Sequence, residues 1–109
     1  MVKKEIERTL AAETIKKVGE KIKLFGWVEA IRDHGRITFL DLRDRSGIVQ
    51  CVGQALSKVT PESVVEIKGS VSKRPENLVN PNLETGEVEV KIENLEVISS
   101  ASEIPIPIS

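Results

Sequence analysis

An outward-facing aromatic ring is the first feature of this sequence that could do chemistry. Leu40 and Leu42 mark the buried face of a predicted strand, so strand alternation turns Phe39 to the opposite face. A lone ring there either covers a hydrophobic gap beneath the N-terminal segment or offers a platform for a nucleic-acid base. Stacking of a base on an aromatic side chain contributes about 1–3 kcal/mol and tolerates any base. The position of Phe39 alone leaves both interpretations open.

A glutamine on the next predicted strand favours the second interpretation. Val49 and Cys51 have the character of core residues, which leaves Gln50 on the same outer surface as Phe39. Adjacent strands can place these two side chains side by side. The glutamine amide has one acceptor and two donor hydrogens, so it can pair with the Watson–Crick edge of a base that stacks on the ring.

Two charged residues extend this candidate surface. Glu89 alternates outward on a later strand, and an ionised carboxylate would select the donor-rich edge of guanine because it only accepts hydrogen bonds. Arg32 ends an earlier strand, from which it can reach a phosphate or a base. A compact surface of polar and aromatic side chains is typical of proteins that bind single strands.

Other chemistries have less support in the sequence. His34 is the only histidine and has no cysteine or histidine partner at the spacing of a metal site. Cys51 is expected to be a small buried hydrophobe rather than a nucleophile. The carboxylates of Asp41, Asp44 and Glu29 do not form a persuasive acid–base pair. No glycine-rich phosphate loop of either usual spacing is present.

Composition narrows the class of protein. The chain has 109 residues, of which 39% are hydrophobic and 30% charged, and this fits one globular domain. No apolar run approaches the ~20 residues that cross a bilayer, and the start MVKKEIERTL lacks the apolar stretch of a signal peptide. With a single cysteine as well, the sequence predicts a cytoplasmic protein without a membrane partner. The net charge of −1 argues against coating nucleic acid by bulk electrostatics, but it allows a small site that reads a few bases.

The apolar pattern predicts an all-β domain with a short N-terminal helix or turn. The helix is expected at residues 9–18, with Gly19 as its stop. Alternation then predicts five strands, at residues 21–31, 36–43, 48–52, 63–71 and from 87 to about 97. Gly26 is expected to mark a bend or bulge in the first strand, and residues 54–58 could make one helical turn. The outline is that of a five-stranded OB-fold barrel, which binds oligonucleotides on strands two and three, with an SH3-like barrel as the structural competitor.

Three long sequence runs resemble one known family. The run GWVEAIRDHGRITFLDLRDRSGIVQ, residues 26–50, closely resembles the anticodon-binding domain of class IIb aminoacyl-tRNA synthetases. The runs RTLAAETIKKVGEKIKLFGWV and NPNLETGEVEV are similar to aspartyl-tRNA synthetases of the bacterial type. The resemblance implies an OB-fold that precedes a much larger catalytic domain, in which ATP and Mg²⁺ are used to attach aspartate to tRNA.

The resemblance also implies roles for the residues of the candidate surface. The family has a phenylalanine on strand two that stacks on the central uridine of the anticodon, and this residue matches Phe39. Its glutamine on strand three hydrogen-bonds to the same uridine and matches Gln50. The arginine after strand one matches Arg32, and the glutamate of strand five matches Glu89.

A loop after the fourth strand is expected to lie near the third anticodon base. Arg74 and Asn77 correspond there to residues of the family, and Asn80 is a rival for the asparagine role. Residues 53–62 form a shorter stretch than in typical bacterial members, at the place of their connecting helix.

The resemblance divides the chain and sets the hypotheses about its function. Residues 1–102 are expected to form the anticodon-binding domain, without catalytic residues, metal or cofactor of its own. Residues 103–109 are expected to begin a linker to an absent catalytic domain. The expected partner is the anticodon loop of tRNA, and the parent enzyme is expected to be a homodimer. The alternatives are a domain of an asparaginyl- or lysyl-tRNA synthetase, which also reads a central uridine, and a stand-alone OB protein that binds single strands.

Overall fold

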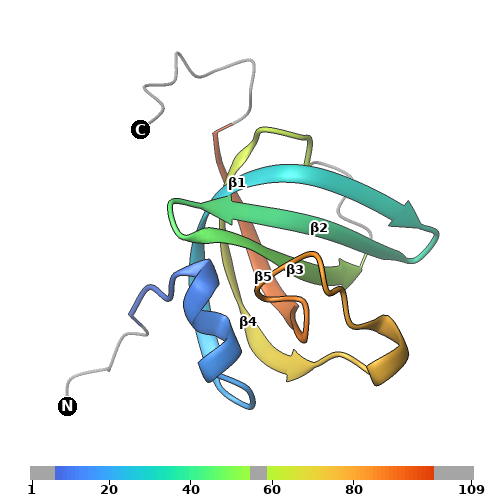
Figure 1. The fold of residues 1–109 in the computed structure, drawn as a ribbon. Coiled ribbons are helices and arrows are strands. Elements are labelled where there is room, and N and C mark those ends of the chain that lie inside the picture. The colour runs from blue at the N-terminus through green and yellow to red at the C-terminus, as the bar shows by residue number, and fades with distance from the viewer. Residues whose placement is uncertain (1–6, 55–58, 100–109) are drawn as a thin grey trace.

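Five strands close into one barrel in the computed structural model, which describes residues 7–54 and 59–99 (Figure 1). In chain order the elements are η1 (Ala11–Lys16), β1 (Lys21–His34), β2 (Ile37–Asp44), β3 (Gly47–Gln54), β4 (Val64–Lys73), η2 (Glu76–Leu78) and β5 (Val88–Ser99). Around the barrel the strands follow the order β1-β2-β3-β5-β4, and β4 pairs with β1 to close it. All pairs are antiparallel except β3 with β5. This arrangement confirms the predicted five-stranded OB-fold barrel and sets aside the SH3-like alternative.

The core consists of the inward side chains of all five strands. Every second residue of a strand faces the barrel interior, so strict alternation of apolar residues produces a continuous apolar centre. Each fully buried Val, Leu or Ile contributes about 1.5–3 kcal/mol through removal of its surface from water. The strand residues that are at most 2% exposed are Ile22, Leu24, Val28, Leu40, Leu42, Val49, Cys51, Val65, Ile67, Val71, Val88 and Val90. Among them, Leu40, Leu42, Val49 and Cys51 confirm the buried positions expected from alternation. Ile92 of β5 is only partly buried against the core.

Strand β1 is shared between two neighbours, since its first half pairs with β4 and its second half with β2. Gly26 lies where the two pairings meet, and a Cβ atom there would overlap the carbonyl oxygen of Arg43. The bulge itself lies at Glu29, between Val28 and Ala30, where the register with β2 shifts. Gly26 therefore permits a close approach of two backbones. Of the two roles expected for it, the bulge lies three residues further on, and the bend stays a prediction.

A buried carboxylate holds η1 against the β2–β3 turn. Asp44 is 3% exposed, and its Oδ2 accepts a hydrogen bond of 2.8 Å from the backbone N–H of Ala11. Its Oδ1 accepts from the backbone N–H and the hydroxyl of Ser46, and the Ser46 hydroxyl accepts from the N–H of Ala12. The first N–H groups of the helix, which have no partner within it, are thereby satisfied. The N-terminal helix predicted over residues 9–18 is confirmed, but it is a shorter 3₁₀ helix.

Some expectations concern residues outside the described ranges. The predicted helical turn at 54–58 falls largely on residues 55–58, and only Gln54 is described, as the last residue of β3. The predicted domain boundary at 102 and the linker at 103–109 also lie outside the described residues. Within the described part of the chain, neither helical segment is long and apolar enough to cross a membrane.

Candidate nucleic-acid interface

The predicted site residues of the first three strands share one outer face of the barrel. Arg32 of β1 lies directly opposite Phe39 of β2 in the antiparallel register. On β3, Val52 lies opposite Phe39, and Gln50 lies opposite Asp41. Directly opposite residues point to the same side of a sheet, and diagonal neighbours lie about 7–8 Å apart. Phe39 and Gln50 are therefore diagonal neighbours on one face, close enough for a single base to contact both.

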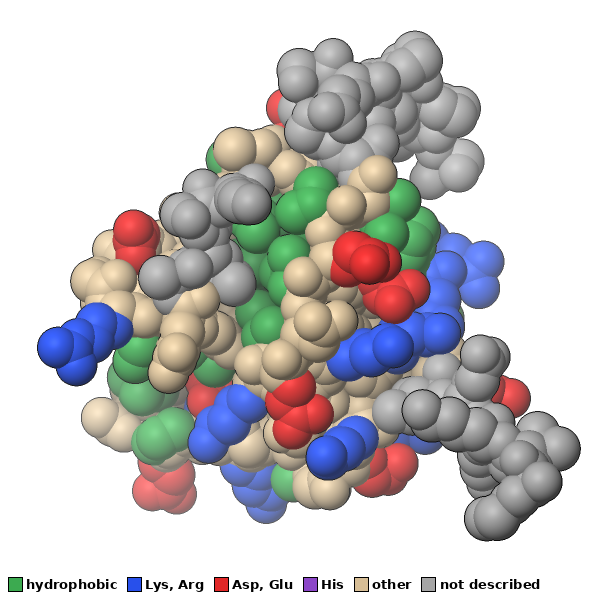
Figure 2. Space-filling view, turned by 180° about the vertical axis from the view of Figure 1, so that it is seen from behind, with side chains coloured by type: hydrophobic (Ala, Val, Ile, Leu, Met, Phe, Trp, Pro, Cys, Tyr) green, Lys and Arg blue, Asp and Glu red, His purple; other side chains and the backbone are tan. Residues whose placement is uncertain are grey.

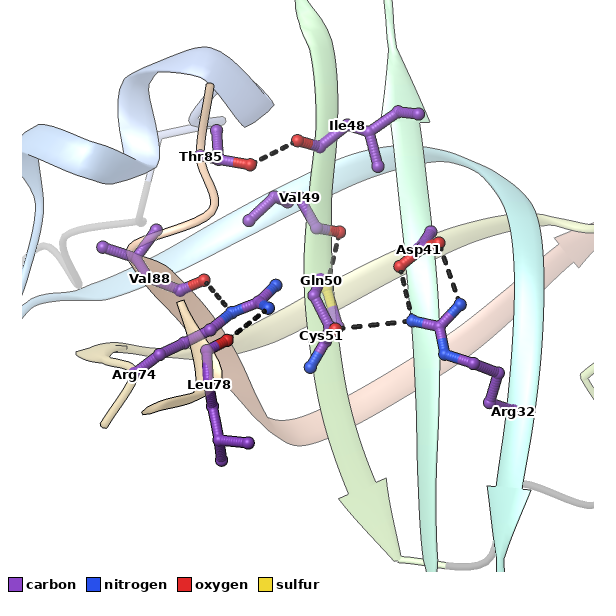
Figure 3. A network of polar contacts seen from close by, with 10 residues as sticks. All are labelled: Arg32, Asp41, Ile48, Val49, Gln50, Cys51, Arg74, Leu78, Thr85 and Val88. Atoms are coloured by element: carbon purple, nitrogen blue, oxygen red, sulfur yellow. Dashed lines mark hydrogen bonds and ion pairs between the residues drawn. The ribbon is translucent and has the colours of Figure 1, made fainter. Parts of the chain in front are cut away.

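The polar centre of this face is a network of Arg32, Asp41 and Gln50 (Figure 3). Arg32 donates two hydrogen bonds to the Asp41 carboxylate, at 3.1 and 3.0 Å, in a bidentate ion pair. It donates a third, longer one of 3.4 Å to the Oε1 atom of Gln50. The hydrogen bonds from Arg32 to Asp41 raise the pKa of the guanidinium, opposing partial burial, and the charge of Asp41 adds to this effect.

Arg32 is thus already bound to protein groups, although the sequence suggested an arginine that simply reaches for RNA. A guanidinium has five N–H donors, and the hydrogen bonds given above use three of them. Its side chain is 44% exposed, whereas that of Asp41 is 18% exposed. Arg32 can consequently contact a ligand while Asp41 fixes its position.

Phe39 is half-buried at the edge of an apolar groove of about 1160 Å³. The edge of its ring meets the ring of His34 at a centroid distance of 5.4 Å and an interplanar angle of 88°. Val52 of β3 and Leu78 of η2 line the same groove, together with Glu89 of β5. From behind, Figure 2 shows a hollow floored by hydrophobic side chains and flanked by charged ones. A planar base could enter such a groove and keep its polar edge toward the charged rim.

A second arginine, Arg74, lies on the other side of β3 from Arg32 (Figure 3). It is 8% exposed, and it donates hydrogen bonds to the carbonyl oxygens of Val88 at 3.0 Å and Leu78 at 3.3 Å. Burial lowers the pKa of this guanidinium, while the negative charges of Glu89 and Asp41 oppose the shift and Arg32 adds to it. Where the sequence suggested a loop residue close to a base, the structure has a buried side chain that joins the end of β4 to β5 and η2.

The two rival asparagines of the β4–β5 loop differ in their contacts. Asn77 is exposed on η2. The side-chain oxygen of Asn80 accepts a hydrogen bond of 2.9 Å from the backbone N–H of Asn82, as in an Asx turn. The backbone of Asn80 also bonds to that of Gly86 and Leu83. Asn80 therefore organises the loop, and Asn77 is the better placed of the two to face a ligand.

Asp41 and His34 are members of this face that sequence reasoning did not assign to it. From the sequence alone, Asp41 was considered only as an unconvincing acid or base. His34 was considered only as a metal ligand. The two-residue spacing from Asp41 to Phe39 was the available signal for the first, whereas the ring contact of His34 depends on the turn that joins β1 to β2.

The described residues do not bring metal-ligating side chains together. Within residues 7–54 and 59–99, no group of three or more His, Cys, Asp or Glu side chains is arranged to hold a metal ion. Cys51 is buried in the core, and burial raises the pKa of its thiol far above the ordinary value, with a further contribution from the charge of Asp41. The residues of this face offer stacking, hydrogen bonding and charge, which are means of recognising a ligand.

The closed barrel and its aromatic, polar face define an OB-fold domain of the kind that binds single-stranded nucleic acid. The chain belongs to the tRNA anticodon family, described as OB-fold nucleic acid binding domains, which it matches over residues 22–98.

Relatives of known name agree with this membership. An aspartate–tRNA(Asp/Asn) ligase of Thermotoga maritima is 51% identical over an alignment of 94 residues, which covers 80% of this chain and 16% of that protein. An asparaginyl-tRNA synthetase structure from Pyrococcus horikoshii is 33% identical with a TM-score of 0.72, covering 94% of this chain and 25% of that one. At the level of the fold alone, an aspartyl-tRNA synthetase structure from Entamoeba histolytica is similar, with a TM-score of 0.78 at 22% identity, covering 94% of this chain and 23% of that one. The chain thus spans about a sixth of the length of the curated relative.

Proposed function

We propose that this chain reads the anticodon of an aspartate tRNA as the N-terminal domain of an aspartate–tRNA ligase. The observation that carries the proposal is the position of Phe39, at the edge of an apolar groove with Gln50 as its diagonal neighbour. A base stacked on the Phe39 ring brings its Watson–Crick edge to the amide of Gln50. One ring and one amide are enough to hold and identify a single central base, which is the uridine of the aspartate anticodon.

The first and third bases of the anticodon are assigned to charged and polar residues around the groove. Glu89 reads the first base, a guanine, because its carboxylate accepts from the N1–H and N2–H₂ donors of that base. Asn77 and Arg74 serve the third base, Asn77 by direct contact from the exposed η2. Arg74 contributes the positive charge of its guanidinium and the shape of the wall, since its Nε and Nη1 atoms are committed to the carbonyl oxygens of Val88 and Leu78.

The activity of the whole enzyme lies elsewhere in the parent protein. Attachment of aspartate to tRNA with ATP and Mg²⁺ is proposed for a catalytic domain beyond residues 1–102, in a homodimeric cytoplasmic enzyme. Support comes from the names of the relatives and from the small share of their length that this chain matches. The described residues offer no set of metal ligands for that chemistry, and no catalytic step is assigned to them.

Titration of the chain with anticodon stem-loops tests this proposal. The anticodons of aspartate (GUC) and asparagine (GUU) share their first two bases and differ in the third. We expect both to bind more tightly, at one fixed salt concentration, than loops with A, C or G at the centre. Equal affinity for all four central bases would refute the proposal.

The same titration separates the alternatives. Preference for GUU over GUC would favour the asparagine enzyme, for which the similarity to the Pyrococcus horikoshii structure is the specific observation. Equal binding of GUC and GUU would indicate a domain that serves both tRNAs, in line with the Asp/Asn name of the Thermotoga maritima relative. Binding of any unpaired strand with similar affinity would indicate a general single-strand binder.

A further inference from the structure

The amide of Gln50 is oriented by a charged donor. Its Oε1 atom accepts from the Nη2 atom of Arg32 at 3.4 Å. An arginine side chain has five N–H donors and no acceptor, so only the oxygen of the amide can face it. If the amide turned over, its N–H₂ group would meet other N–H donors. The arginine therefore decides that the free end of the Gln50 amide carries two donors.

Arg32 is itself held by Asp41. The two hydrogen bonds of the bidentate pair, at 3.1 and 3.0 Å, fix both the position and the plane of the guanidinium. Asp41 lies directly opposite Gln50 in the β2–β3 register, and its side chain is 18% exposed, less than half the exposure of Arg32. Asp41 thus holds the Arg32 guanidinium, and the guanidinium in turn holds the amide of Gln50.

We propose that Asp41 is a positioning residue for base selection: through Arg32 it holds the Gln50 amide with its donors outward, so that the site takes a base with a carbonyl at position 4. This inference rests on the proposed reading of a central uridine. Asp41 need not touch the RNA to have this effect.

The consequence is a preference between the two pyrimidines. Uracil and cytosine both have a carbonyl at position 2, but uracil has a carbonyl oxygen at position 4 where cytosine has an amino group. At position 4, a donor from Gln50 pairs with the uracil O4 atom but faces the amino group of cytosine, which is also a donor. Without Asp41, Arg32 is released, the amide can present its oxygen, and cytosine is accepted as well.

The test compares the affinities of one stem-loop with U or C at its centre, for the unaltered chain and for Asp41→Ala. We expect the ratio of the two affinities to fall about fivefold in the variant, the equivalent of one hydrogen bond of about 1 kcal/mol. Asp41→Asn keeps one acceptor for Arg32 and should give an intermediate ratio. An unchanged ratio, whether or not both affinities fall, would overturn the inference.

A matched control is available on the same two strands. Arg43 of β2 donates a hydrogen bond of 2.6 Å to Glu29 of β1, in an exposed ion pair that is separate from the Arg32 network. Glu29→Ala removes the carboxylate that binds Arg43, and it leaves Arg32 and Gln50 unchanged. The ratio for this variant should equal that of the unaltered chain, and a similar fall would attribute the effect to general loss of charge.

A measurement without RNA separates this inference from the proposed function. In ¹⁵N-resolved spectra, the two Nη groups of a guanidinium held by a bidentate carboxylate give separate signals, because rotation is slowed. We expect separate signals for Arg32 in the unaltered chain and a single averaged signal in Asp41→Ala. Averaged signals in the unaltered chain would overturn the positioning role, whatever the RNA preference. Separate signals with no uridine preference would leave the restraint standing and refute the proposed function, and with it the reading of the central base.

Discussion

The two arginines that flank β3 sit in opposite surroundings. Arg32 is 44% exposed by its side chain and is bound by a carboxylate and an amide, whereas Arg74 is 8% exposed as a residue and donates to two backbone carbonyls. The pKa of the first is raised by its hydrogen bonds to Asp41, and that of the second is lowered by burial. The two arginines thus carry the same charge but have different contacts: Arg32 donates to the Asp41 carboxylate and the Gln50 amide, and Arg74 holds the backbone of η2 and β5 together.

Replacement of Arg74 should have the largest effect on stability. Arg74→Met keeps the aliphatic stem but leaves the carbonyl oxygens of Val88 and Leu78 without their donor. We expect the free energy of unfolding to fall by about 2 kcal/mol, because the buried carbonyl of Val88 is costly to leave without its donor. Urea unfolding monitored by circular dichroism measures the change. A loss below a few tenths of a kcal/mol would contradict the structural role that separates Arg74 from Arg32.

Removal of the stacking ring should act on binding instead. For Phe39→Ala we expect the affinity for an aspartate anticodon stem-loop to fall by the equivalent of about 1–3 kcal/mol, the usual contribution of a base stacked on an aromatic ring. Titration at fixed salt is the measurement, with Phe25→Ala as the control. Phe25 is also a partly exposed strand phenylalanine, but it lies against Arg8, away from the groove. Unchanged affinity in the Phe39 variant would argue against the stacking role.

Loss of the Gln50 amide should reduce the preference for a central uridine more than it reduces the overall affinity for the stem-loop. Gln50→Ala removes one hydrogen bond to the central base, for which we expect a loss of about 1 kcal/mol on loops with a central uridine and little on the others. The four central bases are compared in parallel titrations. Equal losses for all four would mean that Gln50 contributes only to general binding.

Replacement of Arg32 should have the smallest effect on stability. An exposed ion pair typically contributes up to about 1 kcal/mol, so Arg32→Ala should lower the free energy of unfolding by roughly 0.5 kcal/mol. The same urea experiment gives the value, with Arg43→Ala as a matched exposed pair. A loss as large as that of Arg74→Met would show that both arginines are structural.

Much of this face could be predicted from local pattern. Alternation along single strands places Phe39 and Gln50 outward without any knowledge of tertiary structure, since the inward apolar residues leave no other choice. The turn-forming side chain of Asn80 also follows a local rule, because asparagine commonly bonds to the backbone two residues on. The outward direction of a strand residue is therefore available from sequence.

The remaining features depend on how distant segments meet. Arg74 is buried because its guanidinium reaches Val88 and Leu78, which belong to two other elements. The partnership of Arg32 with Asp41 depends on the register of β1 against β2, and that register includes a shift at Glu29. Periodicity within one strand carries no information about a bulge on its neighbour. Sequence reasoning could thus name Phe39 and Gln50 as outward residues, but it could not give the partners of Arg32 and Arg74.

The parallel contact between β3 and β5 has a consequence for the order in which the barrel folds. It consists of two residue pairs, Cys51 with Val90 and Val52 with Lys91, which are far apart in the sequence. Loop closure of this length is slow and is expected late in folding, after the local β1–β2–β3 meander has formed. A chain stopped before this step would hold Phe39 and Gln50 but not Glu89 beside them. Under the proposed function, reading of the first base by Glu89 therefore requires the closed barrel, whereas Phe39 and Gln50 are already brought together by the pairing of β2 with β3.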